Sequence, residues 1–274
     1  MKDYSIGLQL YSVRSDLAND FEGTLKAVSE MGYDGVEFAG LYGKSAMQVK
    51  DLCQKYNLIP ISAHVPFFEM LEAPQKTFET YKEIGCRFVA IPYAGVNERP
   101  LVANYDKTLE NMNELGRLAK SMGLMLMYHN HDFEFVKMEN GTYGYDDIFT
   151  KVSPDLLAPE MDVCWVKVAG EDPCEYLKKY ASRIPVVHFK DFVMPGKKAE
   201  NMYNLIGMEE VKAENAEAFS FRPVGYGIQN VSALVEALDG SVCEWIIIEQ
   251  DEPSMKKSRL ECAKMSIEYM KSLH

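Results

Sequence analysis

Short apolar runs alternate with longer amphipathic segments along almost the whole chain, and this alternation constrains the fold more than any other feature. Runs typical of strands occupy residues 5–11, 35–38, 59–64, 87–92, 156–162, 185–189 and 245–249, and another begins at Met125. Several amphipathic segments end at Gly or Asn, as at Gly32, Asn57 and Gly85. Such residues cap a helix in the left-handed conformation and return the chain to the next strand. Eight strands alternating with helices predict an α/β protein with a (β/α)8 TIM barrel.

The length of the chain fits one such barrel. A (β/α)8 barrel normally takes about 250 residues, and this chain has 274 residues with 47% hydrophobic content. We therefore predict a single domain over residues 1–274. A doubly wound open sheet is the alternative, but no Gly-x-Gly-x-x-Gly follows the first strand-like run to support a dinucleotide site.

A polar stretch between Phe192 and Pro223 interrupts the alternation. It predicts a long loop with at least one helical turn, and the acidic run 208–217 predicts a solvated helix face. Loops of this length in a compact domain are usually functional lids or partly disordered segments.

Charge and cysteine content exclude several classes of partner and location. The net charge is −12 and no basic stripe is present, so nucleic acid is not the expected partner. No apolar run approaches about 18 residues, so no membrane span is expected. The N-terminus lacks the pattern of a signal peptide. Six scattered cysteines without a Cys-x-x-Cys pair indicate free thiols in a reducing compartment. We expect a cytoplasmic protein.

Polar side chains gather where the predicted strands end, which in a barrel is where the active site lies. Four of the five histidines fall at these ends, which favours metal ligands or proton carriers over structural residues. The residues at the predicted strand ends are Gln9, Tyr11, Glu37, His64, Tyr93, His129, His131, Asp162, His188 and Glu249.

Three of these residues form a mixed oxygen and nitrogen set: Asp162, His188 and Glu249. Such a set suits one divalent ion, Mn²⁺, Co²⁺, Zn²⁺ or Mg²⁺, rather than a metal that prefers thiolates. Asp162 and His188 are separated by about one βα unit, which predicts adjacent strands.

The fourth ligand has three candidates, because the stretch YHNHDFEF offers His129, His131 and Glu134. We select Glu134, since a third carboxylate holds a hard divalent ion better.

The motifs GYDGVEF, ISAHVPF, YHNHDFEF, MDVCWVKVAGEDP, VVHFKDF, PVGYGIQN and IIIEQDEP occur in this order between Ile6 and Pro253. In this combination the chain resembles the sugar phosphate isomerase/epimerase family, the xylose isomerase-like barrels that include inosose dehydratases. The resemblance implies a quartet of Glu, Asp, His and Glu around one divalent metal, with the last three at Asp162, His188 and Glu249. His129 occupies the position of the first carboxylate in the epimerase branch, so either His129 or Glu134 would supply that ligand.

Two departures from the family pattern concern the expected pocket. Trp165 stands where epimerase-like members have His, and Gly225-Tyr226-Gly227 stands where the family has Gly-Glu-Gly. Both changes remove a polar group. They predict that Trp165 and Tyr226 form apolar walls for a sugar ring or an aromatic aglycone.

The residues allow proton abstraction next to a carbonyl, with the metal as Lewis acid and an enediolate as intermediate. Glu249 or Glu134 is the candidate base, and His131 and Lys190 are candidates for proton donor or oxyanion stabiliser. Lys190 has a structural alternative, an ion pair with Asp191 or Glu249.

Further residues are candidates for contact with the substrate. The resemblance places Glu37 and His64 at substrate-binding positions, and their alternative role is a buried Glu–His hydrogen bond. The other predicted contacts are Tyr11, Tyr93, His129 and Trp165.

We therefore predict a metal-dependent isomerase, epimerase or dehydratase of a small keto-sugar or polyol. A homo-oligomer is compatible with the sequence, but no stretch of it specifies one. Arg14 and Arg222 lack a Gly-rich phosphate loop, so an unphosphorylated substrate is preferred. The alternatives are a barrel that binds a sugar derivative without turnover and a lyase acting on 3-keto sugars. An abasic-site nuclease would need more metal ligands and a basic surface.

Overall fold

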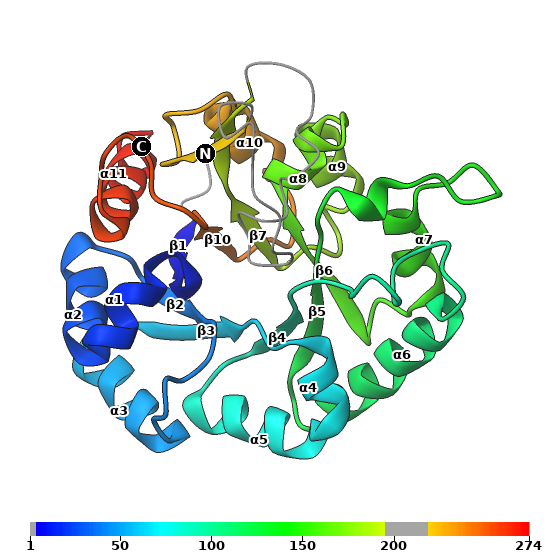
Figure 1. Cartoon of the computed structure of the whole chain (residues 1–274), viewed down its shortest axis with the longest axis horizontal. Coiled ribbons are helices and arrows are strands. Elements are labelled where there is room, and N and C mark those ends of the chain that lie inside the picture. Colours follow the sequence, from blue (N-terminus) through cyan, green and yellow to red (C-terminus); the bar gives the residue numbers. More distant parts are fainter. Residues whose placement is uncertain (1–3, 195–218, 274) are drawn as a thin grey trace.

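Eight parallel strands form one sheet that curls into a barrel in the computed structural model, which describes residues 4–194 and 219–273 (Figure 1). Their order around the sheet is β3-β2-β1-β10-β7-β6-β5-β4. The barrel closes where β3 meets β4, because Arg87 N donates to Ile61 O at 3.1 Å and Val65 N donates to Ala90 O at 3.0 Å. The predicted barrel is confirmed. The strands are β1 (Ser5–Gln9), β2 (Gly35–Phe38), β3 (Ile59–Ala63), β4 (Phe88–Ile91), β5 (Met125–His129), β6 (Leu157–Asp162), β7 (Val186–Phe189) and β10 (Trp245–Ile248).

Helices surround the barrel (Figure 1). The longer ones are α2 (Phe21–Met31), α3 (Ala46–Lys55), α5 (Pro74–Ile84), α6 (Tyr105–Ser121), α7 (Gly144–Lys151), α9 (Pro173–Lys179), α10 (Val231–Ala237) and α11 (Arg259–Lys271). Shorter helical pieces follow several strands: η1 (Leu10–Val13), α1 (Arg14–Asn19), α4 (Phe67–Glu72), η2 (Phe133–Phe135) and α8 (Val163–Val168).

The sequence pattern predicts one helix over Leu17–Met31 and another over Phe68–Ile84, but the structure divides each of them in two. Asp20 lies between α1 and α2 in an extended conformation, and its side chain caps α2 by accepting from Gly23 N. Pro74 is the first residue of α5, where its missing N–H costs nothing, and it stops α4 from continuing. Gly32 and Gly85 end α2 and α5 in the left-handed conformation, as the sequence predicts.

The barrel interior is filled by apolar side chains and, further along the strands, by polar ones. The apolar layer contains Ile61, Phe88, Ala90, Met127, Ala158, Val186, Trp245 and Ile247. Side chains two residues apart on a strand share a face. His129, Glu160, His188 and Glu249 lie two residues beyond Met127, Ala158, Val186 and Ile247, so they follow the apolar layer toward the carboxyl ends of the strands.

The predicted long loop begins and ends in a short antiparallel pair. This pair joins β8 (Asp191–Val193) to β9 (Ser220–Arg222). Residues 195–218, including the acidic run 208–217, lie outside the described residues. Among the helices of the described ranges, none combines the length and apolarity needed to cross a membrane.

Candidate metal centre

A cavity of about 430 Å³ lies at the carboxyl ends of the strands. Its walls include apolar groups from Val65, Pro66 and Pro92, and carboxylates from Glu69 and Asp251. Seven of the residues selected from the sequence also line it: Tyr11, His64, Tyr93, His129, His131, Lys190 and Glu249. The strand-end prediction therefore located the cavity.

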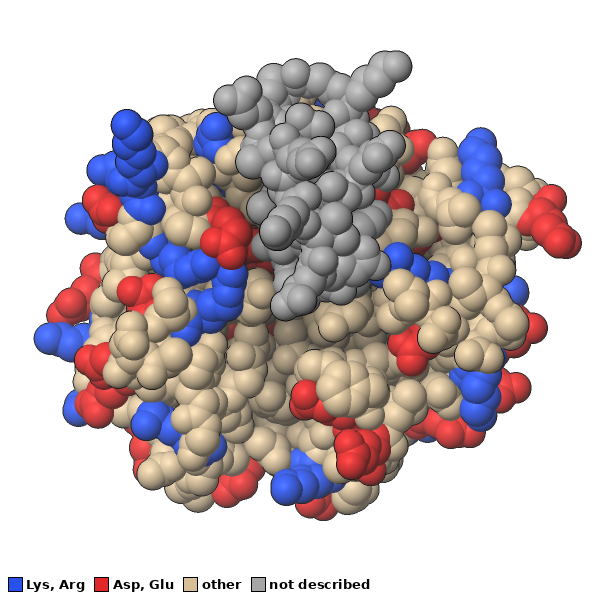
Figure 2. Space-filling view, in the orientation of Figure 1, with Lys and Arg blue, Asp and Glu red and all other residues tan. Residues whose placement is uncertain are grey.

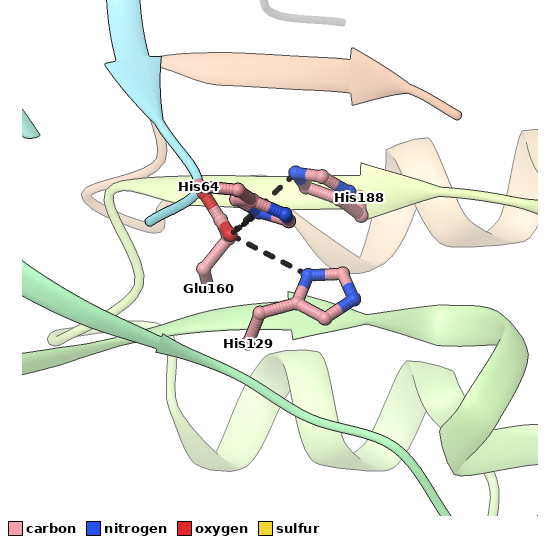
Figure 3. Close-up of side chains that lie close together, drawn as sticks. All are labelled: His64, His129, Glu160 and His188. Atoms are coloured by element: carbon pink, nitrogen blue, oxygen red, sulfur yellow. Dashed lines mark hydrogen bonds and ion pairs between the residues drawn. The ribbon is translucent and has the colours of Figure 1, made fainter. Parts of the chain in front are cut away.

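The first set of possible metal ligands, which we call the histidine-rich group, comprises His64, His129, Glu160 and His188 (Figure 3). One ligand atom from each lies within 4.8 Å of the others. Glu160 Oε2 lies 2.6 Å from His64 Nε2, 3.4 Å from His129 Nδ1 and 3.6 Å from His188 Nε2. Three imidazoles and one carboxylate are a suitable donor set for Zn²⁺, Co²⁺ or Mn²⁺.

The second set, the carboxylate-rich group, comprises His129, Asp162, His188 and Glu249, also within 4.8 Å of one another. His129 Nε2 lies 3.5 Å from Asp162 Oδ2, and His188 Nδ1 lies 2.9 Å from Glu249 Oε2. The three residues predicted from the sequence are thus brought together. His129, one of the alternatives left open, takes the fourth place.

Unsatisfied polar atoms test whether these residues fit a metal. Glu160 Oε1 is buried and has no hydrogen-bond partner within the described part of the chain, and buried His129 Nδ1 has only Glu160 Oε2 nearby, at 3.4 Å. Buried polar atoms are normally hydrogen-bonded, and exceptions often mark an ion site. The donor types and the unsatisfied atoms both fit a divalent cation.

Comparison with known proteins identifies the family of this chain. Residues 25–273 match the sequence model of the family described as xylose isomerase-like TIM barrel. The chain belongs to this family. It is 26% identical over 277 residues to an inosose dehydratase of Clostridium beijerinckii, covering 92% of this chain and 89% of that protein.

Solved structures share the fold of this xylose isomerase-like barrel. A sugar phosphate isomerase/epimerase from Parabacteroides distasonis superposes with a TM-score of 0.79 at 20% identity, covering 99% of this chain and 95% of that one. The IOLI protein, solved with a binding zinc atom, gives a TM-score of 0.73 at 16% identity, covering 98% of this chain and 97% of that one.

Glu134, our selected fourth ligand, lies in neither group of this barrel. The chain leaves β5 and turns through η2, so the Glu134 carboxylate faces back into the protein. It accepts hydrogen bonds from Tyr128 Oη and, at 2.8 Å, from His131 N. Both oxygens are therefore already engaged, and the structure replaces Glu134 by His129 in the carboxylate-rich group.

Glu160 is the ligand candidate that sequence reasoning missed. It lies in β6 between Pro159 and Met161, inside a run that reads as apolar, and its side chain is completely buried. Its spacing of two from Asp162 was the available signal, since both side chains then point to the barrel interior.

Glu37 and Trp165, both predicted to contact substrate, do not line the cavity. Glu37 Oε1 lies 2.8 Å from His188 Nε2 and 3.1 Å from His64 Nε2, so it pairs with these two histidines, which is the alternative role expected for it. Trp165 is fully buried, with its ring 5.0 Å from that of His131 and stacked on Phe219. Tyr226 is 46% exposed beside Tyr269 rather than in the cavity wall.

Lys190 is a buried ammonium surrounded by carboxylates. Its Nζ lies 2.9 Å from Glu249 Oε2, 3.1 Å from Asp162 Oδ2 and 3.0 Å from Asp251 Oδ2. Burial alone would lower the pKa of Lys190, but these carboxylates raise it well above its usual value. The side chain is therefore a fixed positive charge at the cavity, and the expected ion pair with Glu249 is present.

His131 is a neutral ring in the cavity wall. Burial lowers the pKa of His131 well below its usual value, and the charges of His129 and Lys190 lower it further. Its ring stacks on Phe133 with centroids 5.2 Å apart. His131 Nδ1 is buried and has no hydrogen-bond partner among residues 4–194 and 219–273, so its hydrogen-bonding capacity is unused.

Proposed function

We propose that this protein is a divalent-metal-dependent isomerase, epimerase or dehydratase of a small keto-sugar or polyol. The observation that carries the proposal is the cluster of buried histidines and carboxylates at the cavity, with ligand atoms that lack hydrogen-bond partners. The resemblance to an inosose dehydratase and to a sugar phosphate isomerase/epimerase supports the choice of substrate class.

The ligands of the metal would come from His129 and His188 together with carboxylates of the two groups. When bound, a divalent ion supplies Lewis acidity that polarises substrate oxygens.

Glu249 is the carboxylate best placed to take a proton from the carbon next to a carbonyl. It lines the cavity. Burial would raise its pKa, but Lys190 and His188 lower the pKa of Glu249 well below its usual value. The group is therefore ionised at neutral pH and able to act as a general base. Glu134, the other candidate base, does not line the cavity.

After the proton is removed, Lys190 would stabilise the negative charge on the substrate, and His131 would transfer a proton. Because Lys190 stays protonated, its ammonium stabilises negative charge on a substrate oxygen, as preorganised donors do in other enzymes. His131 is neutral and presents a ring nitrogen, which can pass a proton to or from the substrate.

The charge around the cavity favours an uncharged substrate. Glu69, Glu249 and Asp251 line it, and they would repel a phosphate. Arg14, one of the two candidates for phosphate binding, donates instead to Tyr11 O and Asp251 O and pairs with Glu252. On the face drawn in Figure 2, acidic and basic side chains are interspersed, without the basic stripe that nucleic acid requires.

Deuterium exchange tests this proposal directly. The protein, loaded with one equivalent of Mn²⁺, Co²⁺ or Zn²⁺, is incubated in D₂O with keto-sugars, inososes and 3-keto glycosides, and the carbon next to the carbonyl is followed by NMR. We expect deuterium at that carbon for at least one substrate, and at least a 100-fold slower rate for Glu249→Gln, since a general base contributes about 10²–10⁴.

The alternatives give different results in the same experiment. Saturable binding without exchange for every compound would favour a sugar-binding barrel. Release of the substituent from a 3-keto glycoside would favour a lyase. An unchanged exchange rate in Glu249→Gln would transfer the role of base to another residue.

A further inference from the structure

The two overlapping groups differ in whether a lysine ammonium already contacts their oxygens, and this difference decides where a metal binds. The oxygens of the carboxylate-rich group already surround a cation. Lys190 Nζ contacts Asp162 Oδ2 at 3.1 Å and Glu249 Oε2 at 2.9 Å, and the lysine is only 2% exposed. These two oxygens are also the ones that lie nearest His129 Nε2 and His188 Nδ1. A divalent ion there would share both oxygens with a buried ammonium, and two like charges so close in a dry site repel strongly.

The histidine-rich group and the neighbouring Glu37 contain carboxylates that no lysine or arginine contacts within the described ranges. Glu37 and Glu160 are completely buried. Their ion pairs in the described ranges are with histidines only, and no Lys or Arg reaches them. Glu160 Oε1 also lacks a hydrogen-bond partner there. Buried carboxylates are stable when they are paired or coordinate a metal. Metal ligands must be deprotonated, so a divalent ion can replace the protons shared between these histidines and carboxylates without displacing a lysine.

The imidazole rings of His129 and His188 connect the two groups. His129 turns Nδ1 toward Glu160 and Nε2 toward Asp162, while His188 turns Nε2 toward Glu160 and Nδ1 toward Glu249. Histidines that bind a metal through one nitrogen usually donate the other N–H to a carboxylate, which fixes the ring. Asp162 and Glu249 stand in that outer position if the metal lies in the histidine-rich group.

We infer that the site is a paired-cation centre, with one divalent ion held by His64, His129, Glu160 and His188, and the Lys190 ammonium held by Asp162, Glu249 and Asp251. This inference rests on the metal dependence in the proposed function. In this arrangement Asp162 and Glu249 do not bind the metal. They orient His129, His188 and Lys190 instead.

The paired-cation centre also defines the substrate more closely. His64 and His129 line the cavity from one cation position, and Lys190 lines it from the other. A substrate with oxygens on two adjacent carbons, such as an α-hydroxyketone, can meet the metal with one oxygen and the ammonium with the other.

Metal affinity in matched variants tests the inference without an activity assay. His64 and Glu160 belong only to the histidine-rich group, whereas Asp162 and Glu249 belong only to the carboxylate-rich group. We expect His64→Gln and Glu160→Gln to weaken Co²⁺ binding in equilibrium dialysis by more than about 100-fold, and Asp162→Asn and Glu249→Gln to weaken it by about 10–100-fold at most, the range of outer partners. The opposite ranking would overturn the inference.

Removal of the ammonium gives a second measurement. In Lys190→Met the oxygens of Asp162 and Glu249 are free to bind a metal in place of Glu160, so we expect Glu160→Gln to weaken Co²⁺ binding at least about 10-fold less in this background than in the parent. Lys120→Met, which removes an exposed ion pair with Asp155, is the matched control background and should leave the loss unchanged. An unchanged loss in folded Lys190→Met would show that the ammonium does not hold a cation position. If this variant does not fold, the four near-isosteric variants still decide.

Failure of the inference differs from failure of the proposed function. One Co²⁺ that depends on Asp162 and Glu249 but not on His64 and Glu160 would overturn only the paired-cation centre. A parent protein that binds no divalent metal would overturn both.

Discussion

At the scale of one residue, Glu134 shows how burial changes the pKa of a carboxyl group close to the site. It is completely buried, and its pKa is raised to about 7 by that burial, even though Tyr128 Oη and His131 N donate to it. In the unfolded chain the group has a pKa near 4.5. The folded protein therefore binds this proton more tightly than the unfolded chain does.

The pH dependence of stability follows from that difference. The contribution of Glu134 is fully present below about pH 4.5 and is lost as the pH rises through about 7, by up to roughly 3 kcal/mol. Glu134→Gln stays uncharged, so we expect its free energy of unfolding to fall less between pH 5 and pH 8 than that of the parent. Urea unfolding at both pH values measures this, with the exposed Glu139→Gln as control. Parallel curves for the parent and Glu134→Gln would contradict the prediction.

At the scale of elements, Asp191 ties the end of the barrel strand β7 to the segment after β9. Its carboxylate accepts from Gly225 N at 3.0 Å, Gly227 N at 2.9 Å and Gln229 N at 3.1 Å. A Cβ on Gly227 would lie 2.2 Å from Asp191 Oδ1, so only glycine allows this approach. The Gly-Tyr-Gly sequence is thus a carboxylate-binding turn that fixes the residue next to Lys190.

Substitution of Asp191 tests the strength of this connection. Asp191→Asn removes the charge and leaves one acceptor oxygen for several N–H groups, so we expect the free energy of unfolding to fall by about 2–3 kcal/mol. Asp172→Asn is the control, because the exposed Asp172 caps α9 and asparagine caps nearly as well. Urea unfolding of both variants at pH 7 measures the difference, and equal losses would contradict a special role for Asp191.

At the scale of the whole molecule, metal binding and folding are coupled, because the ligands come from strands far apart in the sequence. His64 follows β3, whereas His129, Glu160 and His188 lie on β5, β6 and β7. Only the closed barrel brings them together, so a metal that binds them stabilises the folded state.

The expected stabilisation is measurable. At free metal 100 times above Kd, the gain is about 2.7 kcal/mol, which corresponds to a rise in Tm of roughly 5–10 °C for a chain of this size. EDTA should return Tm to the metal-free value. His188→Gln removes a ligand of both groups, so its Tm should not respond to Co²⁺; a full response in this variant would contradict the placement of the metal.

The sequence by itself determined the barrel and the location of its site. Hydrophobic periodicity is local, so the eight strands and the helix ends at Gly32 and Gly85 could be predicted residue by residue. Strand ends of a barrel meet at one face, and for that reason Asp162, His188, Glu249 and Lys190 could be predicted to converge before any contact was known.

Only the tertiary structure decided which side chains meet inside the barrel. Glu134 looked like a ligand, yet the turn after β5 directs it to Tyr128; Glu160 looked like part of an apolar strand, yet its inward face makes it a partner of three histidines. Trp165 likewise packs in the core instead of the cavity. The direction of a side chain beyond a strand end, and the charge that it meets there, depend on neighbours from distant strands, which local sequence patterns do not contain.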